Sequence, residues 1–351
     1  MIDVASAFTL AWRVGHRLPG WVVRALTTVG ADVAWLRRGA GVRRLEANLA
    51  RVRPELDARA LRRLSRAGMR SYMRYYGEAF TLRGLDAERL AARVRLRGVE
   101  RLQPYLDEGR QVVLALGHLG NWDLAGAWAT QYLAPVTTVA ERLEPEALFR
   151  EFLGFREGLG MTIVPLTKGG DVFRTLVRAA RTGPGVVPLL ADRDLTSHGL
   201  EVDLLGHRAR VAAGPAALAV TTGAPLVVAA ITYERLYGAE RRAAGSPWGI
   251  RIDFSERIEV PEGLPRSEQV QAMTQAWVDV LGAAIHARPQ DWHMLQRVFV
   301  DDLDPAVDAA RRAAAGSGGP TEGTQGAAPD GAPVRRGDAA DGDVLDVGRA
   351  R

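Results

Sequence analysis

The spacing of apolar residues divides the chain of 351 residues into three parts. From residue 1 to about 90, apolar side chains recur at helical spacing, for example from Trp21 to Leu36, and Pro19 with Gly20 interrupts the pattern. This periodicity predicts an N-terminal helical hairpin. From about 91 to 303, short apolar runs alternate with helical stretches, which is typical of β-α-β units. We therefore predict an α/β fold in which helices flank a mainly parallel central sheet.

The elements of the second part can be placed along the chain. We predict strands at 111–117, 136–140, 161–166, 185–191, 225–232 and 250–254, and helices near 123–133, 145–158, 171–181, 214–222 and 267–287. The third part, 304–351, is rich in Ala, Gly, Pro, Asp and Arg, with few large apolar residues. Such a composition cannot bury enough surface to offset its ordering entropy, so we expect a short helical end and then a largely disordered tail.

Arginines interleave with Trp12, Trp21 and Trp35 in the N-terminal part. An apolar stripe with tryptophans and basic residues suits a helix lying in a lipid headgroup layer. Helices that cover the core of their own domain show the same period. The pattern alone leaves both interpretations open.

The most informative strand ends beside a histidine. The apolar run Val112–Leu116 leads into Gly117 and His118, and Asp123 follows in the first turn of the next helix. Open parallel sheets bind ligands just beyond the carboxyl ends of their strands. A histidine there can take a proton from a hydroxyl if a second group fixes its tautomer, and Asp123 is predicted to be that group. The alternative is a helix N-cap beside a buried histidine.

Composition narrows the chemistry. The chain has no cysteine, which excludes disulfides, Cys-ligated zinc and a cysteine nucleophile. Of its 46 basic residues only Lys168 is a lysine, and arginine forks suit phosphorylated or acidic partners, although a GC-rich genome produces the same bias. No apolar run reaches the roughly 18 residues of a spanning helix, and the N-terminus does not resemble a secretory signal, so we expect a cytoplasmic location.

The sequence lacks the signatures of other enzyme classes. No G-x-S-x-G elbow of a serine hydrolase is present, and Lys168 does not stand in a phosphate-loop order. Gly117 and Gly120 do not supply the G-x-G-x-x-G of a dinucleotide fold. The non-enzymatic alternative is a basic module that binds a membrane or nucleic acid through the N-terminal helices, but its tryptophans do not form a base-stacking sheet platform.

The motif His118-Leu-Gly-Asn-Trp-Asp123 resembles the H-x-x-x-x-D signature of glycerophosphate and lysophospholipid acyltransferases. Its surroundings are most similar to the lipid A lauroyl acyltransferase branch, and within it to the actinobacterial enzymes that acylate phosphatidylinositol mannosides. The resemblance runs from about residue 1 to 303 and includes the stretches 141–146, 152–160, 191–195 and 291–296.

This resemblance implies an α/β core with a hydrophobic groove for an acyl chain, and neither a metal, a cofactor nor a covalent acyl-enzyme. On that basis His118 deprotonates a mannose hydroxyl, which attacks the thioester of acyl-CoA, and Asp123 holds the ring and stabilises its positive charge. Helix-start amides or an arginine would stabilise the oxyanion. The expected donor group is palmitoyl, the expected location is peripheral, on the cytoplasmic face of the cell membrane with its anionic surface, and no nucleic acid is expected as a partner.

The resemblance also suggests residues around the sugar headgroup. Glu141, Arg156 and Asp192 match polar positions of the family. Arg142 and Arg193 are added as phosphate or oxyanion partners, with salt-bridged surface arginines as the alternative. His293 is a candidate acceptor contact or a satisfied core residue. Asp192 is favoured over Asp194 and Glu201 as the sugar-facing acid because it follows its strand directly, and lipid A type or lysophospholipid acceptors remain the alternative substrates.

Overall fold

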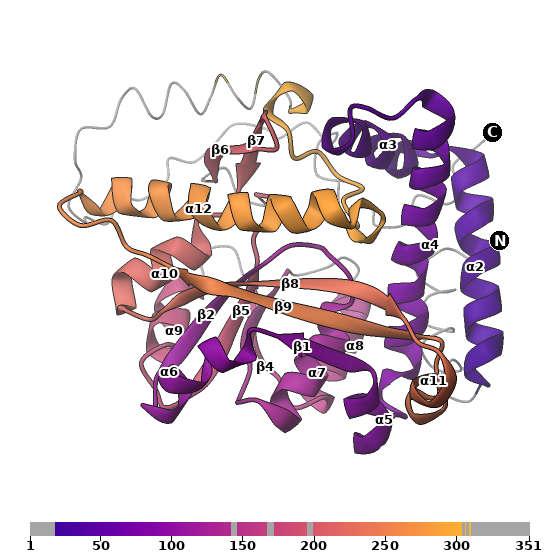
Figure 1. Ribbon diagram of the computed structural model, residues 1–351. Coiled ribbons are helices and arrows are strands. Elements are labelled where there is room, and N and C mark those ends of the chain that lie inside the picture. Colours follow the sequence, from indigo (N-terminus) through magenta and orange to yellow (C-terminus); the bar gives the residue numbers. More distant parts are fainter. Residues whose placement is uncertain are drawn as a thin grey trace.

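A five-stranded sheet lies at the centre of the computed structural model (Figure 1), which describes residues 18–141, 146–166, 172–194, 199–303, 306 and 309. The strand order is β1-β9-β8-β2-β5. The β8 and β9 strands pair antiparallel, and the other neighbours pair parallel. The predicted α/β fold class is therefore confirmed. The strands of this sheet are β1 Val94–Arg97, β2 Gln111–Leu116, β5 Gly185–Leu190, β8 Leu226–Arg235 and β9 Trp248–Ile258.

Two short strand pairs accompany the central sheet. β3 (Thr137–Glu141) pairs parallel with β4 (Thr162–Leu166), and a bridge between Val136 and Val186 sets this pair beside β5. β6 (Leu200–Leu204) and β7 (His207–Val211) form an antiparallel hairpin. The strands β1, β6 and β7 were not predicted, because each is short and carries charged residues on its exposed side.

Helices cover both faces of the sheet. Alternate residues of β2 enter different cores: Val112, Leu114 and Leu116 pack with α4, α7 and α8, whereas Val113 and Ala115 pack with α9, α10 and α12. A mainly parallel sheet is stable only when both faces are covered, which explains the continuous apolar run of β2. The helices are α2 Gly20–Arg37, α3 Ala40–Val52, α4 Ala58–Leu82, α5 Ala87–Ala92, α6 Gln103–Asp107, α7 Trp122–Tyr132, α8 Glu146–Gly158, α9 Val172–Ala179, α10 Gly214–Thr222, α11 Gly238–Ala244 and α12 Arg266–Ala287, with 3-10 turns η1 Val99–Arg101, η2 Pro289–Asp291 and η3 Val300–Asp302.

The N-terminal helices stand at one end of the sheet, where α2 lies along α4 (Figure 1). Helix α2 begins directly after Pro19, as the Pro-Gly break predicts. The first arm of the predicted hairpin, with Trp12, and most of the predicted tail lie outside the described residues. Among the residues that are described, no helix has both the length and the hydrophobicity needed to cross a bilayer.

The apolar stripe of α2 faces outward. Trp21, Leu26 and Leu36 are each more than 60% exposed, whereas Val23 and Ala31 on another side of the helix are buried against the protein. On α2, the stripe therefore does not cover the core of the domain. An exposed apolar patch of this kind marks an interaction surface.

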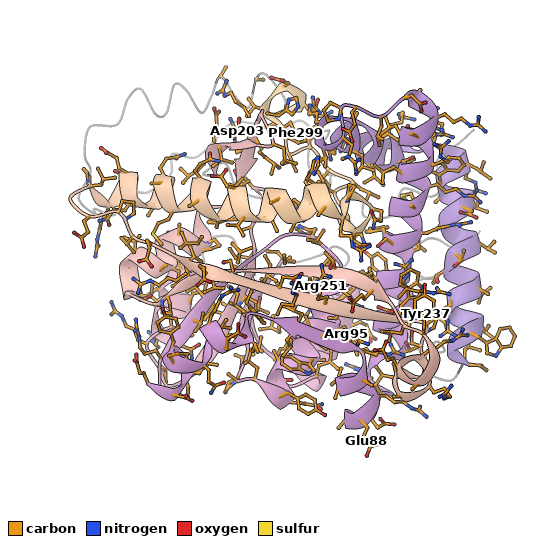
Figure 2. The ribbon with its side chains drawn as sticks, in the orientation of Figure 1. Glu88, Arg95, Asp203, Tyr237, Arg251 and Phe299 are labelled. Atoms are coloured by element: carbon orange, nitrogen blue, oxygen red, sulfur yellow. The ribbon has the colours of Figure 1, made fainter. Side chains whose placement is uncertain are left out.

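Charged residues follow the strands β1 and β9 along the surface (Figure 2). Arg95 on β1 lies directly opposite Arg251 on β9 in the parallel register. Like charges in such a position repel, but Glu234 of β8 lies 3.4 Å from Arg95 and 3.8 Å from Arg251. Closer carboxylates complete the ion pairs, Glu240 at 2.6 Å from Arg95 and Asp253 at 2.8 Å from Arg251, so the repulsion at this sheet edge is offset.

Candidate active site

Two hydrogen bonds hold the backbone of His118. The His118 amide donates to Oδ2 of Asp192 at 2.9 Å, and its carbonyl accepts from the His293 amide at 2.7 Å. A side chain on Gly117 would meet Leu281 at 2.9 Å and the Asp192 carboxylate at 3.1 Å. Gly117 therefore leaves room for the close approach of the His118 backbone to this carboxylate.

The imidazole of His118 is paired with Asp192. Nδ1 lies 2.6 Å from Oδ1 of Asp192, whose Oδ2 also accepts from the indole of Trp292 at 2.8 Å. The side chain of Asp192 is 2% exposed and that of His118 is 18% exposed. A proton on Nδ1, held by the carboxylate, leaves Nε2 as the basic atom of the ring. The partially exposed ring thus has the arrangement of an oriented general base.

The pKa of Asp192 lies below its usual value. Burial favours the neutral acid, but the charge of a protonated His118 and the hydrogen bonds from His118 and Trp292 outweigh this effect. Asp192 is therefore ionised at neutral pH and can stabilise a positive charge on the imidazole.

Asp123 does not hold His118, so this prediction is wrong. Its carboxylate accepts from the Tyr75 hydroxyl at 2.6 Å and from Nε of Arg156 at 2.7 Å. Asp123 lies in the first turn of α7, and its side chain is directed at α4 and α8 instead of back towards the strand end. The N-cap is Asn121, whose side chain accepts from the Leu124 amide at 3.0 Å.

Arg156 forms a buried pair with Asp123. Burial disfavours the charged guanidinium, but Asp123 and Tyr75 outweigh it, so the pKa of Arg156 lies above its usual value. The Tyr75 hydroxyl has a raised pKa because it is buried and faces the Asp123 carboxylate. These three side chains tie α4, α7 and α8 together beside the histidine loop.

Three other candidate residues bond to groups outside the His118–Asp192 pair. Arg193 follows Asp192 directly and donates to Gln296, while Asp194 accepts from the Gly199 amide at 2.9 Å. Glu201 pairs with Arg208 and Arg210 of β7. Asp192, which was expected to face the sugar, is instead buried with its carboxylate against the imidazole, in the place predicted for Asp123.

Glu141 is the last residue of β3, but its side chain is outside what the structure describes. Arg142 lies outside the described residues altogether.

His293 is a buried residue beside the centre. It is 5% exposed, its Nε2 lies 3.0 Å from Oγ of Ser71, and the ring of Trp122 lies 6.1 Å away. Burial, with the charges of Arg74 and His118, lowers the pKa of His293 to about 3. The ring is neutral, and its Nδ1 has no hydrogen-bond partner in the described part of the protein.

An apolar cavity of about 70 Å³ lies between β2 and α7. Leu116, Ala129 and Phe254 are among its walls, and the Asp123–Arg156 pair closes one side. Trp122 lines this cavity and also contacts the His118 ring at 5.5 Å between centroids. The volume is well below the roughly 300 Å³ at which ligand pockets begin, so a long chain can enter only after side chains move.

Several residues of the centre were missed by sequence reasoning. Trp292 belongs to a stretch that the resemblance singled out, but nothing local indicated its bond to Asp192. Tyr75 and Glu78 come from α4, and Glu78 accepts from Asn121 at 2.7 Å and from the Tyr233 hydroxyl at 3.1 Å. Only the tertiary fold brings α4 to this loop. In the described residues there is no cluster of three or more His, Asp or Glu side chains arranged to hold a metal.

The α/β fold places a partly exposed histidine, paired with a carboxylate, at the carboxyl edge of the sheet, and comparison with known proteins gives the class of the protein. The sequence model of the bacterial lipid A biosynthesis acyltransferases matches residues 3–300, so the chain belongs to this family. It is an acyltransferase.

Curated relatives cover most of the chain. It is 38% identical to a phosphatidylinositol mannoside acyltransferase of Mycolicibacterium smegmatis over 296 residues, which span 84% of this chain and 91% of the relative. It is 37% identical over 310 residues to a protein of the same description from Mycobacterium tuberculosis, spanning 87% and 92% of the two chains.

Proposed function

We propose that the protein transfers a fatty acyl group, palmitoyl in the first instance, from acyl-CoA to a mannose hydroxyl of a phosphatidylinositol mannoside. The names of the two relatives support the acceptor. The observation that carries the chemistry is the His118–Asp192 pair, at 2.6 Å, with the ring partly exposed at the carboxyl end of β2.

In the proposed reaction, Nε2 of His118 removes the proton of the mannose hydroxyl as its oxygen attacks the thioester carbon. The new C–O bond forms, the C–S bond breaks, and the proton passes from the imidazolium to the thiolate of coenzyme A. Asp192 stabilises the imidazolium that exists between these two proton transfers. No covalent acyl-enzyme is required.

The apolar cavity beside Trp122 supports binding of the acyl chain near the thioester. Most of its lining residues are apolar, and we expect this cavity of about 70 Å³ to widen into a groove when an acyl chain enters. The Asp123–Arg156 pair stands where this cavity meets the polar centre. We assign it the positioning of α7 and of Trp122, with Arg156 also a candidate contact of the headgroup.

We assign binding of the acceptor headgroup to polar residues of the loops around the His118 centre. Glu141, Arg142 and Arg193 are the proposed contacts of the sugar and of the phosphate. The burial of His293 favours a supporting role over direct contact with the acceptor.

The exposed stripe of α2 supports peripheral attachment to a membrane. Trp21, Leu26 and Leu36 present apolar surface that would enter the headgroup layer of the cytoplasmic leaflet. A chain bound in this way would reach both acyl-CoA from solution and a lipid acceptor from the membrane.

The test is an assay of the purified protein with palmitoyl-CoA against phosphatidylinositol mannosides and, separately, a lipid A precursor. The acylated product is followed by mass, with His118→Ala as the control. The proposal expects a product with the mannosides that His118→Ala does not form. Acylation of the lipid A precursor alone would contradict the acceptor, and full turnover by His118→Ala would contradict the base.

A further inference from the structure

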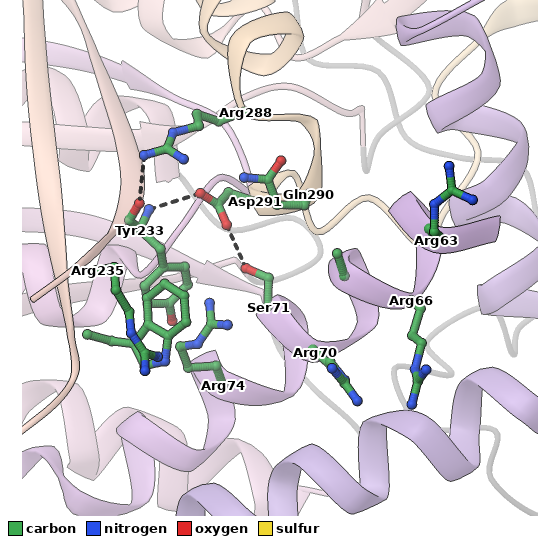
Figure 3. A pocket seen from close by; sticks show the side chains of 12 residues that line it. Arg63, Arg66, Arg70, Ser71, Arg74, Tyr233, Arg235, Arg288, Gln290 and Asp291 are labelled. Carbon is green, nitrogen blue, oxygen red and sulfur yellow. Dashed lines mark hydrogen bonds between the residues drawn. The ribbon is translucent and has the colours of Figure 1, made fainter. Parts of the chain in front are cut away.

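A second cavity, of about 400 Å³, lies among α4, the end of β8 and the turn after α12 (Figure 3). It shares no lining residue with the apolar cavity beside Trp122. Its volume falls within the roughly 300–1,000 Å³ of sites that bind small ligands or headgroups. The acyl-transfer chemistry proposed for His118 does not use it.

Six arginines line this cavity against a single carboxylate. Arg66 and Arg70 each form a bidentate salt bridge with Asp32 of α2, with closest contacts of 2.7 and 2.6 Å. The carboxylate, Asp291, is buried and accepts from Ser71 and from the Tyr233 amide. The other four arginines are Arg63, Arg74, Arg235 and Arg288. No carboxylate of the described residues lies within ion-pair distance of them.

Aromatic rings, instead of carboxylates, hold two of these arginines. The guanidinium of Arg74 lies 3.7 Å from the ring centre of Trp248 and 4.6 Å from that of Tyr233. Arg235 lies 4.9 Å from the Trp248 ring. Stacking fixes a guanidinium by its face and leaves its N–H groups free to bind in the ring plane. The cavity thus presents ordered donors with a surplus of positive charge, which suits a phosphate group.

Two arginines of the cavity connect it to helix α2 and its exposed stripe through Asp32. Asp32, which binds Arg66 and Arg70, lies three residues after Val29 and four before Leu36, so the three share one side of the helix. Val29 and Leu36 are 61% and 67% exposed. A membrane that receives this stripe would bring its phosphates to the level of the arginines.

We propose that this arginine-lined cavity binds the phosphate of an anionic phospholipid headgroup and anchors the protein on the membrane apart from the His118 centre. The proposal rests on the membrane location in the proposed function, but not on the acyl donor or the acceptor. A phosphate held here would fix the orientation of α2 and α4 relative to the lipid surface.

The first test compares two double variants of equal charge change. Arg63→Gln with Arg235→Gln removes two exposed donors of the cavity, and Arg97→Gln with Arg257→Gln removes two exposed arginines of β1 and β9. The affinity for phosphatidylinositol-containing phosphatidylcholine vesicles, measured by co-sedimentation, should fall about tenfold or more in the cavity pair. Each basic residue at an anionic surface contributes about 1 kcal/mol to binding. The control pair should change less than threefold. Equal losses in both variants would overturn the proposal, because they indicate only general surface charge.

The second test separates a lipid headgroup from a soluble phosphate. Glycerophosphoinositol should bind the wild-type protein in calorimetry and lose its binding in the cavity variant. If adenosine 3′,5′-bisphosphate binds there and glycerophosphoinositol does not, the cavity serves a nucleotide and the headgroup assignment is wrong. Palmitoyl-CoA turnover in detergent solution should be unchanged in the cavity variant, so a failure of acyl transfer is distinguished from a failure of this site.

Discussion

The side chains of His118 and Asp192 meet because they occupy equivalent places on neighbouring parallel strands. Leu116, the last residue of β2, pairs with Leu190, the last residue of β5, and His118 and Asp192 each lie two positions beyond the end of their strand. The sheet register therefore brings Nδ1 and Oδ1 to 2.6 Å. This geometry assigns the orienting role to the acid after β5 and not to the acid of the H-x-x-x-x-D motif.

Asp123→Asn should mainly lower stability. The change leaves the buried guanidinium of Arg156 without its anionic partner, which costs roughly 3 kcal/mol. Urea unfolding measures this loss, and Asp123→Asn combined with Arg156→Met should recover part of it, since no buried charge then remains unpaired. An unchanged unfolding free energy together with a loss of turnover by orders of magnitude would place Asp123 in the chemistry instead.

Gly120→Ala should disrupt the histidine loop. Gly120 has a φ of 64°, and an added methyl group would collide with the carbonyl oxygen of Ile231. Gly109 is a matched control, because its φ is 74° and no atom lies within 4 Å of the added carbon. Both changes share the left-handed strain of about 1 kcal/mol or more, but Gly120→Ala should cost a further ~1–3 kcal/mol and lower turnover. Equal unfolding free energies in the two variants would show that the close approach is unimportant.

The protein should lose stability as the pH falls, because His293 is buried in its neutral form. Its folded pKa of about 3 lies below the unfolded value, so the unfolded chain binds the extra proton between these values. Stability is therefore fully present above about pH 6.5 and declines as the pH falls towards 3. With an unfolded pKa of about 6.5, one such histidine contributes a decline of about 2 kcal/mol between pH 7 and pH 5.

His293→Gln removes this titration and keeps a side chain that can bond Ser71. The difference in unfolding free energy between pH 7 and pH 5 should therefore shrink by about 2 kcal/mol relative to the wild type. His286→Gln, at an exposed position of α12, is the control and should leave the pH dependence as it is. A wild-type slope retained by His293→Gln would mean that the ring is already charged or exposed in the folded protein.

Ala129→Leu should shorten the acyl groups that the enzyme accepts. Ala129 lines the apolar cavity, and three added carbon atoms reduce a space of only about 70 Å³. Turnover with palmitoyl-CoA should fall at least tenfold, whereas turnover with butyryl-CoA should change less than threefold, which also shows that the fold is intact. A parallel loss with both donors would contradict the role of this cavity in holding the chain.

The sequence predicted the sheet better than the site. Buried strands such as β2 and helices such as α10 stand out through long apolar runs or caps, and α10 has the predicted bounds of 214–222. β6 and β7 are too short and too charged to be recognised by the same means. The proposed base, His118, was marked by its place at a strand end, but its partner depends on the register of β2 with β5, which no local pattern contains.

The direction of the apolar stripe on α2 was also beyond the sequence. Helical spacing gives the same signal whether a stripe packs inward or outward. Only the docking of α2 on α4 through Thr27 and Ala31 shows that Trp21 and Leu36 face away from the core. The arginine-lined cavity depends on the same docking, because Arg66 and Arg70 meet Asp32 there.

The role of Asp192 is tested most directly by single-turnover transfer from palmitoyl-CoA with Asp192→Asn, beside Asp123→Asn and the wild type. An asparagine beside Nδ1 cannot hold the ring in the same tautomer or stabilise the imidazolium, so the rate should fall by roughly two to four orders of magnitude while the folded protein keeps its near-ultraviolet spectrum. An Asp192→Asn rate within twofold of the wild type, with the loss of rate appearing in folded Asp123→Asn, would contradict the orienting role of Asp192.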